Sequence, residues 1–237
     1  MWTFRVLLVI ILYNFIACDD SDEPVLYYYG LEESERSLSE CGARAACAAL
    51  LLRAWRAPAL VRLCRCARRT RCDTRAPPDR LLDLNNRAYF QFCTPITNWP
   101  ECSFSDTALS VETLYERMNP DDLEDAHHKN VQLTPPKVVL NCRCRYPYYW
   151  RLNSTTQTDT TYTYQCGSLP LCKTGDFCGN VNYDLNALYQ SCLCPRNHIC
   201  VHNGGITHYY ISELLYRGKG WKAYCQPLND DYSYDDY

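Results

Sequence analysis

The hydrophobic pattern of the chain begins with one continuous apolar run near the start, and only short apolar runs follow it. Residues 1–5 include one arginine, an apolar run covers residues 6–17, and an acidic stretch begins at Asp19. A charged start, a short apolar run and a small residue at its end are typical of a secretory signal peptide. The run is shorter than the roughly 20 residues of a membrane-spanning helix. The pattern therefore predicts a signal peptide over residues 1–18 and a secreted, extracellular protein.

Cys18 allows a second interpretation of this start, a lipidated bacterial lipoprotein. A glycan sequon and a dense cysteine framework further along the chain do not suit that class. Of the 17 cysteines, cleavage after Cys18 leaves an even number, so that every remaining cysteine can be paired. Cleavage after Ala17 would leave an odd thiol, and the count therefore favours the cut after Cys18.

The remaining hydrophobic pattern predicts a small, disulfide-rich and mostly β protein. Short runs of β-branched and aromatic residues near cysteines are typical of strands. Such strands are predicted at residues 88–93, 138–144, 160–166 and 206–211. One short helix is predicted over residues 43–55, near the start of the first cysteine group, where Ala and Leu dominate and Pro58 follows. Residues 106–118 fit either a helix or a strand.

Cysteine spacing reveals an internal repeat. Six cysteines recur in order at offsets between 128 and 132 residues. The first set is Cys41, Cys47, Cys64, Cys66, Cys72 and Cys93, and the second is Cys172, Cys178, Cys192, Cys194, Cys200 and Cys225. Between them lie Cys102, Cys142, Cys144 and Cys166. Because each group contains a C-x-C pair, we predict three related cystine-stapled β units, of which the middle one is abbreviated.

The pairing within each set stays open, because six cysteines allow many connectivities. Residues i and i+2 of a strand point to the same face, so Cys64 and Cys66 present their sulfurs side by side. Each is therefore expected to bond a different partner. Zinc is the alternative use of cysteine, but it needs reduced thiolates and the chain has no C-x2-C pair. Neither a metal nor a cofactor is expected.

Composition divides the chain into six segments. They are a signal peptide (1–18), an acidic Tyr-containing segment (19–36), a first cystine module (37–93), a central four-cysteine unit (94–166), a second cystine module (167–226) and an acidic Tyr-rich tail (227–237). The tail has nothing to bury and is expected to be disordered. Tyrosines in acidic contexts are candidate sulfation sites, with plain solvated segments as the alternative. They are Tyr27, Tyr28, Tyr29, Tyr232, Tyr234 and Tyr237.

Charge is strongly segregated, although the formal net charge is only −3. Residues 36–90 contain twelve arginines, no lysine and four acidic residues, an excess of eight positive charges. On a secreted protein such a patch favours sulfated glycans such as heparan sulfate, or an acidic protein face, over nucleic acid. The alternative is internal pairing with the acidic segments on either side. The surface of residues 53–75 is predicted to be retained on heparin.

Candidate chemistry is sparse and favours binding over catalysis. Asn153 begins the N-x-[ST] sequon of the chain, which predicts a glycan on a surface loop. The sequence contains no G-x-S-x-G or H-E-x-x-H motif, and no enzyme activity is expected. The histidines are expected in a loop (His127, His128) and on cystine-hairpin surfaces rather than in a metal site (His198, His202, His208). Tyrosine is abundant, with 20 of 237 residues, and either forms a binding surface or covers cystines.

The order of the cysteine motifs resembles a known family. The motifs are LCRCARRTRC, NNRAYFQFCTPITNWPEC, NCRCRYP, YTYQCGSLPLC, SCLCPRNHIC and a final AYC. Over residues 64–225 the chain is similar to the Argos (giant-lens) type of secreted EGF receptor antagonists, and scoloptoxin-11-type venom proteins have a related framework. The resemblance implies a protein without catalytic activity that sequesters an EGF-like growth factor between cystine-rich β modules. A toxin-like or channel-directed role is the alternative. Ala67 departs from Pro195 of the second C-x-C segment, and no ligand-contact residues can be carried over.

Overall fold

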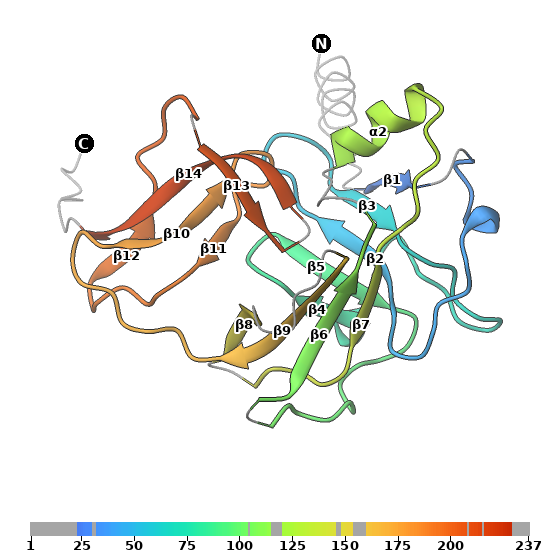
Figure 1. Cartoon of the computed structure of the whole chain (residues 1–237), viewed down its shortest axis with the longest axis horizontal. Coiled ribbons are helices and arrows are strands. Elements are labelled where there is room, and N and C mark those ends of the chain that lie inside the picture. Colours follow the sequence, from blue (N-terminus) through green and yellow to red (C-terminus); the bar gives the residue numbers. More distant parts are fainter. Residues whose placement is uncertain are drawn as a thin grey trace, which may run out of the picture.

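The described residues of the chain fold into three β sheets, as the computed structural model shows (Figure 1). The structure describes residues 23–29, 32–103, 105–114, 120–145, 148–153, 160–207, 209–214 and 216–228. Each sheet belongs to one cysteine group, and we call residues 41–93 the first unit, 102–166 the middle unit and 172–225 the third unit. The predicted class, a small disulfide-rich and mostly β protein, is confirmed.

The sheet of the first unit has five strands in the order β1-β3-β2-β5-β4. The strands are β1 (Val25–Tyr28), β2 (Ala46–Leu51), β3 (Ala59–Arg62), β4 (Leu81–Asp83) and β5 (Ala88–Phe92). β1 runs parallel to β3, whereas the other neighbours are antiparallel. Two short 3-10 helices, η1 (Glu35–Ser37) and η2 (Pro78–Arg80), lie in the connections.

The middle unit has a four-stranded sheet in the order β7-β6-β9-β8. Its strands are β6 (Thr107–Glu112), β7 (Lys137–Leu140), β8 (Tyr149–Leu152) and β9 (Thr161–Gly167). Within the ambiguous stretch of residues 106–118, residues 107–112 form strand β6, and residues 115–118 lie outside the described residues. The strand expected over residues 138–144 ends earlier, at Leu140.

The third unit repeats this antiparallel arrangement in the order β11-β10-β14-β12, with β13 also paired to β14. Its strands are β10 (Phe177–Asn182), β11 (Leu188–Gln190), β12 (His198–Val201), β13 (Tyr209–Glu213) and β14 (Tyr216–Pro227). The strand predicted over residues 206–211 therefore begins later, at Tyr209. In Figure 1 this unit occupies one end of the molecule, away from the side-by-side first and middle units.

The helix predicted over residues 43–55 is wrong, because Ala46–Leu51 forms strand β2. β2 lies between β3 and β5, and its first four residues are buried. A central strand that is covered on both faces is apolar without alternation. The helix preference of Ala and Leu is weak, and sheet packing overrides it.

The loop expected around His127 and His128 is also wrong, because both residues end helix α2 (Pro120–His128). Pro120 opens the helix at a position where its missing N–H is not needed. Asp121 and Asp122 follow in the first turn, where the helix dipole favours acidic side chains. A short polar helix of this kind has no strong apolar period to reveal it.

All sixteen cysteines of the three units are paired, and the outer units share one connectivity. The first unit has Cys41–Cys64, Cys47–Cys72 and Cys66–Cys93, and the third has Cys172–Cys192, Cys178–Cys200 and Cys194–Cys225. Both therefore join the first cysteine to the third, the second to the fifth and the fourth to the sixth. The middle unit has Cys102–Cys142 and Cys144–Cys166. In every unit the two cysteines of the C-x-C pair bond different partners.

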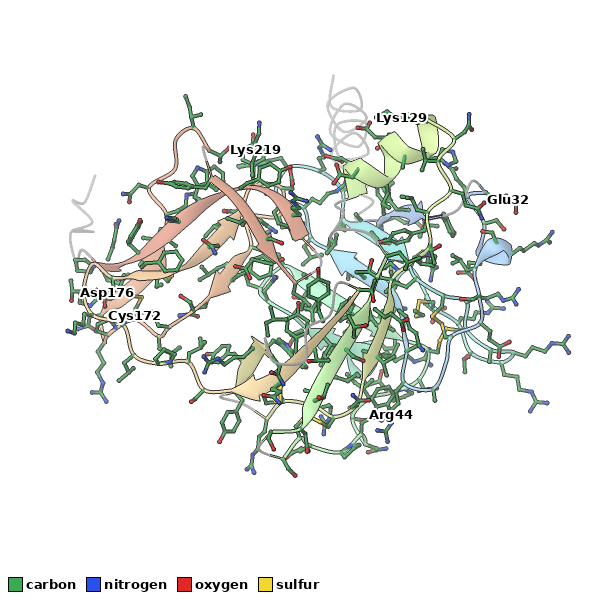
Figure 2. The ribbon with its side chains drawn as sticks, viewed as in Figure 1. Glu32, Arg44, Lys129, Cys172, Asp176 and Lys219 are labelled. Atoms are coloured by element: carbon green, nitrogen blue, oxygen red, sulfur yellow. A yellow bond between two sulfur atoms is a disulfide. The ribbon has the colours of Figure 1, made fainter. Side chains whose placement is uncertain are left out.

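The backbone repeats as closely as the cystines do. The residue before the first cysteine forms a parallel bridge with the residue inside the C-x-C pair, and the bridges are Glu40 with Arg65, Glu101 with Arg143 and Leu171 with Leu193. Three residues after the first cysteine, each unit has a residue with positive φ: Arg44 at 58°, Ser105 at 75° and Gly175 at 80°. Figure 2 labels this turn by Arg44 in the first unit and by Cys172 and Asp176 in the third.

The middle unit replaces the missing cystine with Ala108 and Trp150. These residues stand six positions after Cys102 and Cys144, where the other units have their second and fifth cysteines. Ala108 is fully buried, as Cys47 and Cys178 are, and the register shifts at this point in all three units. Trp150 pairs across the sheet with Cys166 as Cys200 pairs with Cys225.

The interior has two kinds of cluster. A large apolar core lies between the first and middle units, and it includes Val61, Phe90, Phe92, Leu109, Val138, Leu140 and Tyr164. Two smaller clusters are built around cystines, one with Ala48 and Leu60 in the first unit and one with Val181 and Ala223 in the third. The first and middle units thus share a large core. The third unit is organised mainly around its own sulfurs, and it joins the others through Leu214 of the large core and a small cluster of Ala88, Leu185 and Ala187.

Candidate functional site

A cavity of about 250 Å³ lies where the three units meet. Its walls come from the shared core, from the β2–β3 connection and from the third unit. The apolar lining includes Leu51, Val61, Leu63, Leu84, Val111, Leu185 and Leu214, and the tyrosines are Tyr29, Tyr162, Tyr164, Tyr183, Tyr189 and Tyr216. We call this space the central cavity. A concave, mostly apolar site with a few polar groups is the usual form of a binding site.

Arg53 supplies a positive charge to the wall of the central cavity. Its side chain is only 7% exposed. Its Nε donates to the Ala57 carbonyl at 2.7 Å, and a terminal nitrogen donates to the Tyr27 hydroxyl at 3.0 Å. Asp121 Oδ1 lies 3.9 Å from Arg53 and 2.8 Å from Arg56. The two arginines therefore tie the β2–β3 connection to the start of α2.

The third unit closes the cavity through Tyr216 and Asp184. The Tyr216 hydroxyl donates to Asp184 Oδ2 at 2.9 Å. Burial and then the Asp184 carboxylate raise the pKa of Tyr216, so that its hydroxyl stays protonated. The Ala54 N–H donates to the Asp184 carbonyl at 3.1 Å. This bond joins the loops of the first and third units directly.

The rim of the central cavity carries large exposed side chains. Trp55 is 90% exposed and Tyr183 is 51% exposed, and Arg56 is also exposed. Trp, Tyr and Arg are the residue types that dominate the energy of protein–protein interfaces. An exposed Trp beside an apolar opening is the kind of anchor that a protein partner contacts. We call these three residues the rim.

The basic segment divides into paired and unpaired arginines. Arg53, Arg56, Arg62 and Arg80 form ion pairs with Asp121, Glu35 or Asp73. Within the part of the chain that the structure describes, no ion pair involves the exposed residues Arg65, Arg68, Arg69, Arg71 and Arg75. Internal pairing, one of the two alternatives for this segment, therefore accounts for some of its arginines and leaves a cluster of others facing solvent.

The remaining candidate residues are dispersed. His198 contacts the Thr174 hydroxyl at 2.9 Å, whereas His202 stacks on Trp221 with ring centroids 4.4 Å apart. Among the described residues, the close groups of metal-ligating side chains consist of cysteines that are paired as disulfides. Tyr164 belongs to the shared core and Tyr148 is 49% exposed. The tyrosines thus serve both as core and as surface.

Several predictions fall wholly or partly outside the described residues. They concern the signal peptide, the acidic tail with Tyr232, Tyr234 and Tyr237, and His208. Asn153 follows β8 and donates its backbone N–H to the Thr163 carbonyl at 2.8 Å. The rest of its sequon is not described, so glycosylation at Asn153 stays a prediction. Among the described residues, no helix is long and apolar enough to cross a membrane.

Sequence reasoning missed the central cavity and its rim. The cavity is formed by residues far apart in the chain, such as Trp55, Tyr162 and Tyr216, and spacing alone does not bring them together. Trp55 was assigned to the end of a helix that does not exist. The available signal was Pro58, three residues later, because Pro is one of the residues that mark turns.

Comparison with known proteins identifies one structural neighbour. No protein-family model and no curated protein sequence matches the chain. A crystal structure of unliganded Argos matches with a TM-score of 0.50 at 18% sequence identity, and the match covers 87% of this chain and 100% of the other. The resemblance read from the cysteine motifs is therefore confirmed in three dimensions. At this identity the likeness shows a shared fold.

Proposed function

We propose that the chain is a secreted extracellular protein that binds and sequesters an EGF-like growth factor, and thereby inhibits signalling by its receptor. The observation that carries the proposal is the fold shared with Argos over 87% of the chain. The cysteine motifs that resemble Argos-type antagonists support the same function. We propose binding rather than catalysis for this fold.

Secretion is part of the proposal. Two features support it: the apolar segment over residues 6–17 and eight cystines. Disulfides form and persist in oxidising compartments and are rare in the cytosol. A chain with this signal and this number of cystines is suited to the extracellular space.

The rim of the central cavity is the surface that we assign to the protein ligand. Trp55 and Arg56 come from the first unit and Tyr183 from the third, so a ligand seated there contacts two cystine-rich units at once. The hydrogen bond from Ala54 to Asp184 fixes the two loops relative to each other. A preformed rim of this kind loses little entropy on binding, which raises affinity.

The proposal is tested by measuring binding of EGF-like growth factors to the oxidised, secreted protein by surface plasmon resonance. We expect Trp55→Ala to weaken binding about 30-fold or more, because truncating a central aromatic anchor removes about 2 kcal/mol. Tyr148→Ala is the matched control, since its side chain is about as exposed as Tyr183 but does not line the cavity. We expect it to change affinity less than about threefold.

Two outcomes separate the parts of this proposal. If no EGF-like factor binds at roughly micromolar concentration, growth-factor sequestration is wrong, and the toxin-like alternative gains support. If a factor binds but Trp55→Ala and Tyr148→Ala behave alike, the function stands and the rim is the wrong surface.

A further inference from the structure

The segment from Cys64 to Arg75 presents an unusually dense and unpaired positive charge. It contains five arginines and one acidic residue, Asp73. All five arginines are exposed. Asp73 is engaged elsewhere, since its carboxylate lies 3.8 Å from Arg80. The nearest acidic neighbour by backbone pairing is Glu40, which bridges to Arg65. We call Arg65, Arg68, Arg69, Arg71 and Arg75 the arginine cluster.

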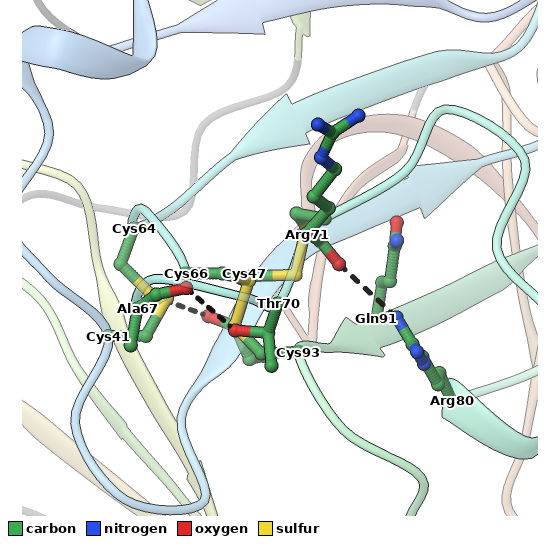
Figure 3. The surroundings of a disulfide bond; sticks show 12 residues. Cys41, Cys47, Cys64, Cys66, Ala67, Thr70, Arg71, Arg80, Gln91 and Cys93 are labelled. Atoms are coloured by element: carbon green, nitrogen blue, oxygen red, sulfur yellow. Dashed lines mark hydrogen bonds between the residues drawn. A yellow bond between two sulfur atoms is a disulfide. The ribbon is translucent and has the colours of Figure 1, made fainter.

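Cystines hold the arginine cluster in a fixed shape. All three disulfides of the first unit end in this segment, at Cys64, Cys66 and Cys72. Between Cys66 and Cys72 the chain turns, with the Thr70 N–H and hydroxyl both donating to the Ala67 carbonyl, at 3.1 Å and 2.9 Å. Figure 3 shows the Arg71 side chain pointing away from these cystines. Binding therefore requires ordering of the side chains but not of the backbone.

Two further arginines support the backbone of the segment from beneath. Arg62 is buried and donates to the Cys72 carbonyl, and Arg80 donates to the Arg71 carbonyl at 3.4 Å. These two side chains have a structural role. The arginine cluster has no comparable role, because its side chains extend into solvent.

The third unit shows that the turn does not need the full set of arginines. Its corresponding residues are Pro195, Arg196, Asn197, His198 and Ile199. The same turn forms there, since the His198 N–H donates to the Pro195 carbonyl at 3.2 Å. Asn197 has a φ of 59° where Arg69 has 78°. The scaffold therefore tolerates Asn and Ile at the places of Arg69 and Arg71, whereas Arg196 matches Arg68. The extra arginines of the first unit are left for recognition.

We propose that the arginine cluster binds sulfated glycosaminoglycan chains. Guanidinium groups form bidentate, charge-assisted hydrogen bonds with sulfate-type oxygens. The segment has no exposed large hydrophobic side chain, whereas a protein interface has an apolar centre. A repeating polyanion, by contrast, can bind through the positive charges alone. None of the five arginines lines the central cavity, so this surface is separate from the site proposed for the protein ligand.

The test is affinity for size-defined heparin oligosaccharides, with the full oxidised chain, at several salt concentrations. The variant Arg68→Gln/Arg69→Asn/Arg71→Gln removes three charges. Asn was chosen at position 69 because the third unit has Asn197 at the same place in its turn. We expect it to weaken heparin binding about tenfold or more, because three exposed ionic contacts are lost. The variant Arg68→Lys/Arg69→Lys/Arg71→Lys keeps the charge and is expected to retain most of the binding.

The matched control is Lys173→Gln/Arg196→Gln/Lys219→Gln, which removes the same number of charges from exposed positions of the third unit. We expect it to change heparin affinity less than about threefold. An equal loss in both triple variants would show that net charge alone retains the protein. Elution of the unmodified protein from heparin below about 0.2 M salt would contradict a functional site.

Polyanions that lack sulfate complete the test. We expect hyaluronan and poly-L-glutamate to bind much more weakly than heparin, because both offer carboxylates in place of sulfates and hyaluronan also has a lower charge density. If poly-L-glutamate competes as well as heparin, the cluster recognises acidic protein and the glycan assignment is wrong. Near-ultraviolet circular dichroism checks that each variant retains the fold.

Discussion

The first and third units have the same pattern of three cystines. The equivalent face of the sheet is nevertheless buried in the first unit and exposed in the third. Counted back from the last cysteine, Phe90 and Phe92 of β5 correspond to Lys222 and Tyr224 of β14. Phe90 and Phe92 are at most 1% exposed, whereas Tyr224 is 37% exposed and Lys222 is exposed as well. The face that the first unit packs against the middle unit is therefore a surface in the third.

The middle unit shows what compensates for a lost cystine. Leu109 and Val111 of β6 stand where the outer units have Ala48 and Leu50, or Gly179 and Val181. In the outer units this face covers the sulfurs, but in the middle unit it belongs to the core shared with the first unit. Disulfides thus define each unit locally. Large apolar side chains join the first and middle units through an extensive core, and they reach the third unit only at Leu214 and in one small cluster.

Phe90→Ala gives the largest expected effect on this comparison. Phe90 is fully buried between two units, so its truncation should lower the free energy of unfolding by about 3 to 5 kcal/mol. Lys222→Ala, at the equivalent place in the third unit, loses only an exposed cation–π contact with Tyr209 and should cost about 1 kcal/mol or less. Urea unfolding of the oxidised protein measures both. Similar losses in the two variants would contradict the difference between the faces.

Removing the disulfide between the second and fifth cysteines of each outer unit distinguishes the stability that the disulfide provides from the stability that the shared core provides. Cys47–Cys72 and Cys178–Cys200 close loops of similar length, with sequence separations of 25 and 22. Loop entropy alone therefore predicts a similar cost of about 3 kcal/mol for each. Because the first unit is also held by the apolar core, we expect Cys47→Ala/Cys72→Ala to remain locally folded.

The matching variant Cys178→Ala/Cys200→Ala should open the third unit, whose cluster consists largely of cysteines. Hydrogen exchange measured by mass spectrometry would show loss of protection in β10 and β12 while the first and middle units stay protected. Equal loss of protection in both variants would mean that the shared core does not support the first unit when the cystine is absent.

Much of the framework was accessible from the sequence, because cysteine spacing is a local and regular signal. The repeat and the C-x-C pairs with split partners followed from it. Runs of β-branched and aromatic residues likewise indicated β5, which ends at Phe92, and β9, which ends at Gly167. Which cysteines pair could not be derived, since it depends on how strands align in space. The alanines of β2 were misread because intrinsic helix propensity is weaker than burial in the middle of a sheet.

The candidate site was less accessible than the fold. The positive charge of residues 64–75 was visible, but exposure and counter-charges decide whether it can bind, and these come from packing. Arg62 and Arg71 look alike in sequence, yet one is buried against Cys72 and the other is exposed. The rim depends on loops of two units brought together by the bond between Ala54 and Asp184, which no spacing reveals.

The smallest expected effect concerns His202 of the third unit, which has Thr74 at its place in the first. The ring stacks on Trp221, and burial lowers the pKa of His202 below its usual value of about 6.5. Below that value the unfolded chain binds a proton that the folded chain resists, so stability falls as the pH drops from about 7 toward 5. His202→Thr should remove this part of the pH dependence and also lower the melting temperature at pH 7 slightly, because the ring stacks on Trp221 and its Nδ1 accepts from the Gly204 N–H at 3.0 Å. NMR titration of the ring protons checks the direction. A pKa at or above about 6.5 in the folded protein would show that stacking on Trp221 does not desolvate the ring. His202 would then cause no loss of stability at low pH, and the third unit would not differ in this respect from the first, which has the neutral Thr74.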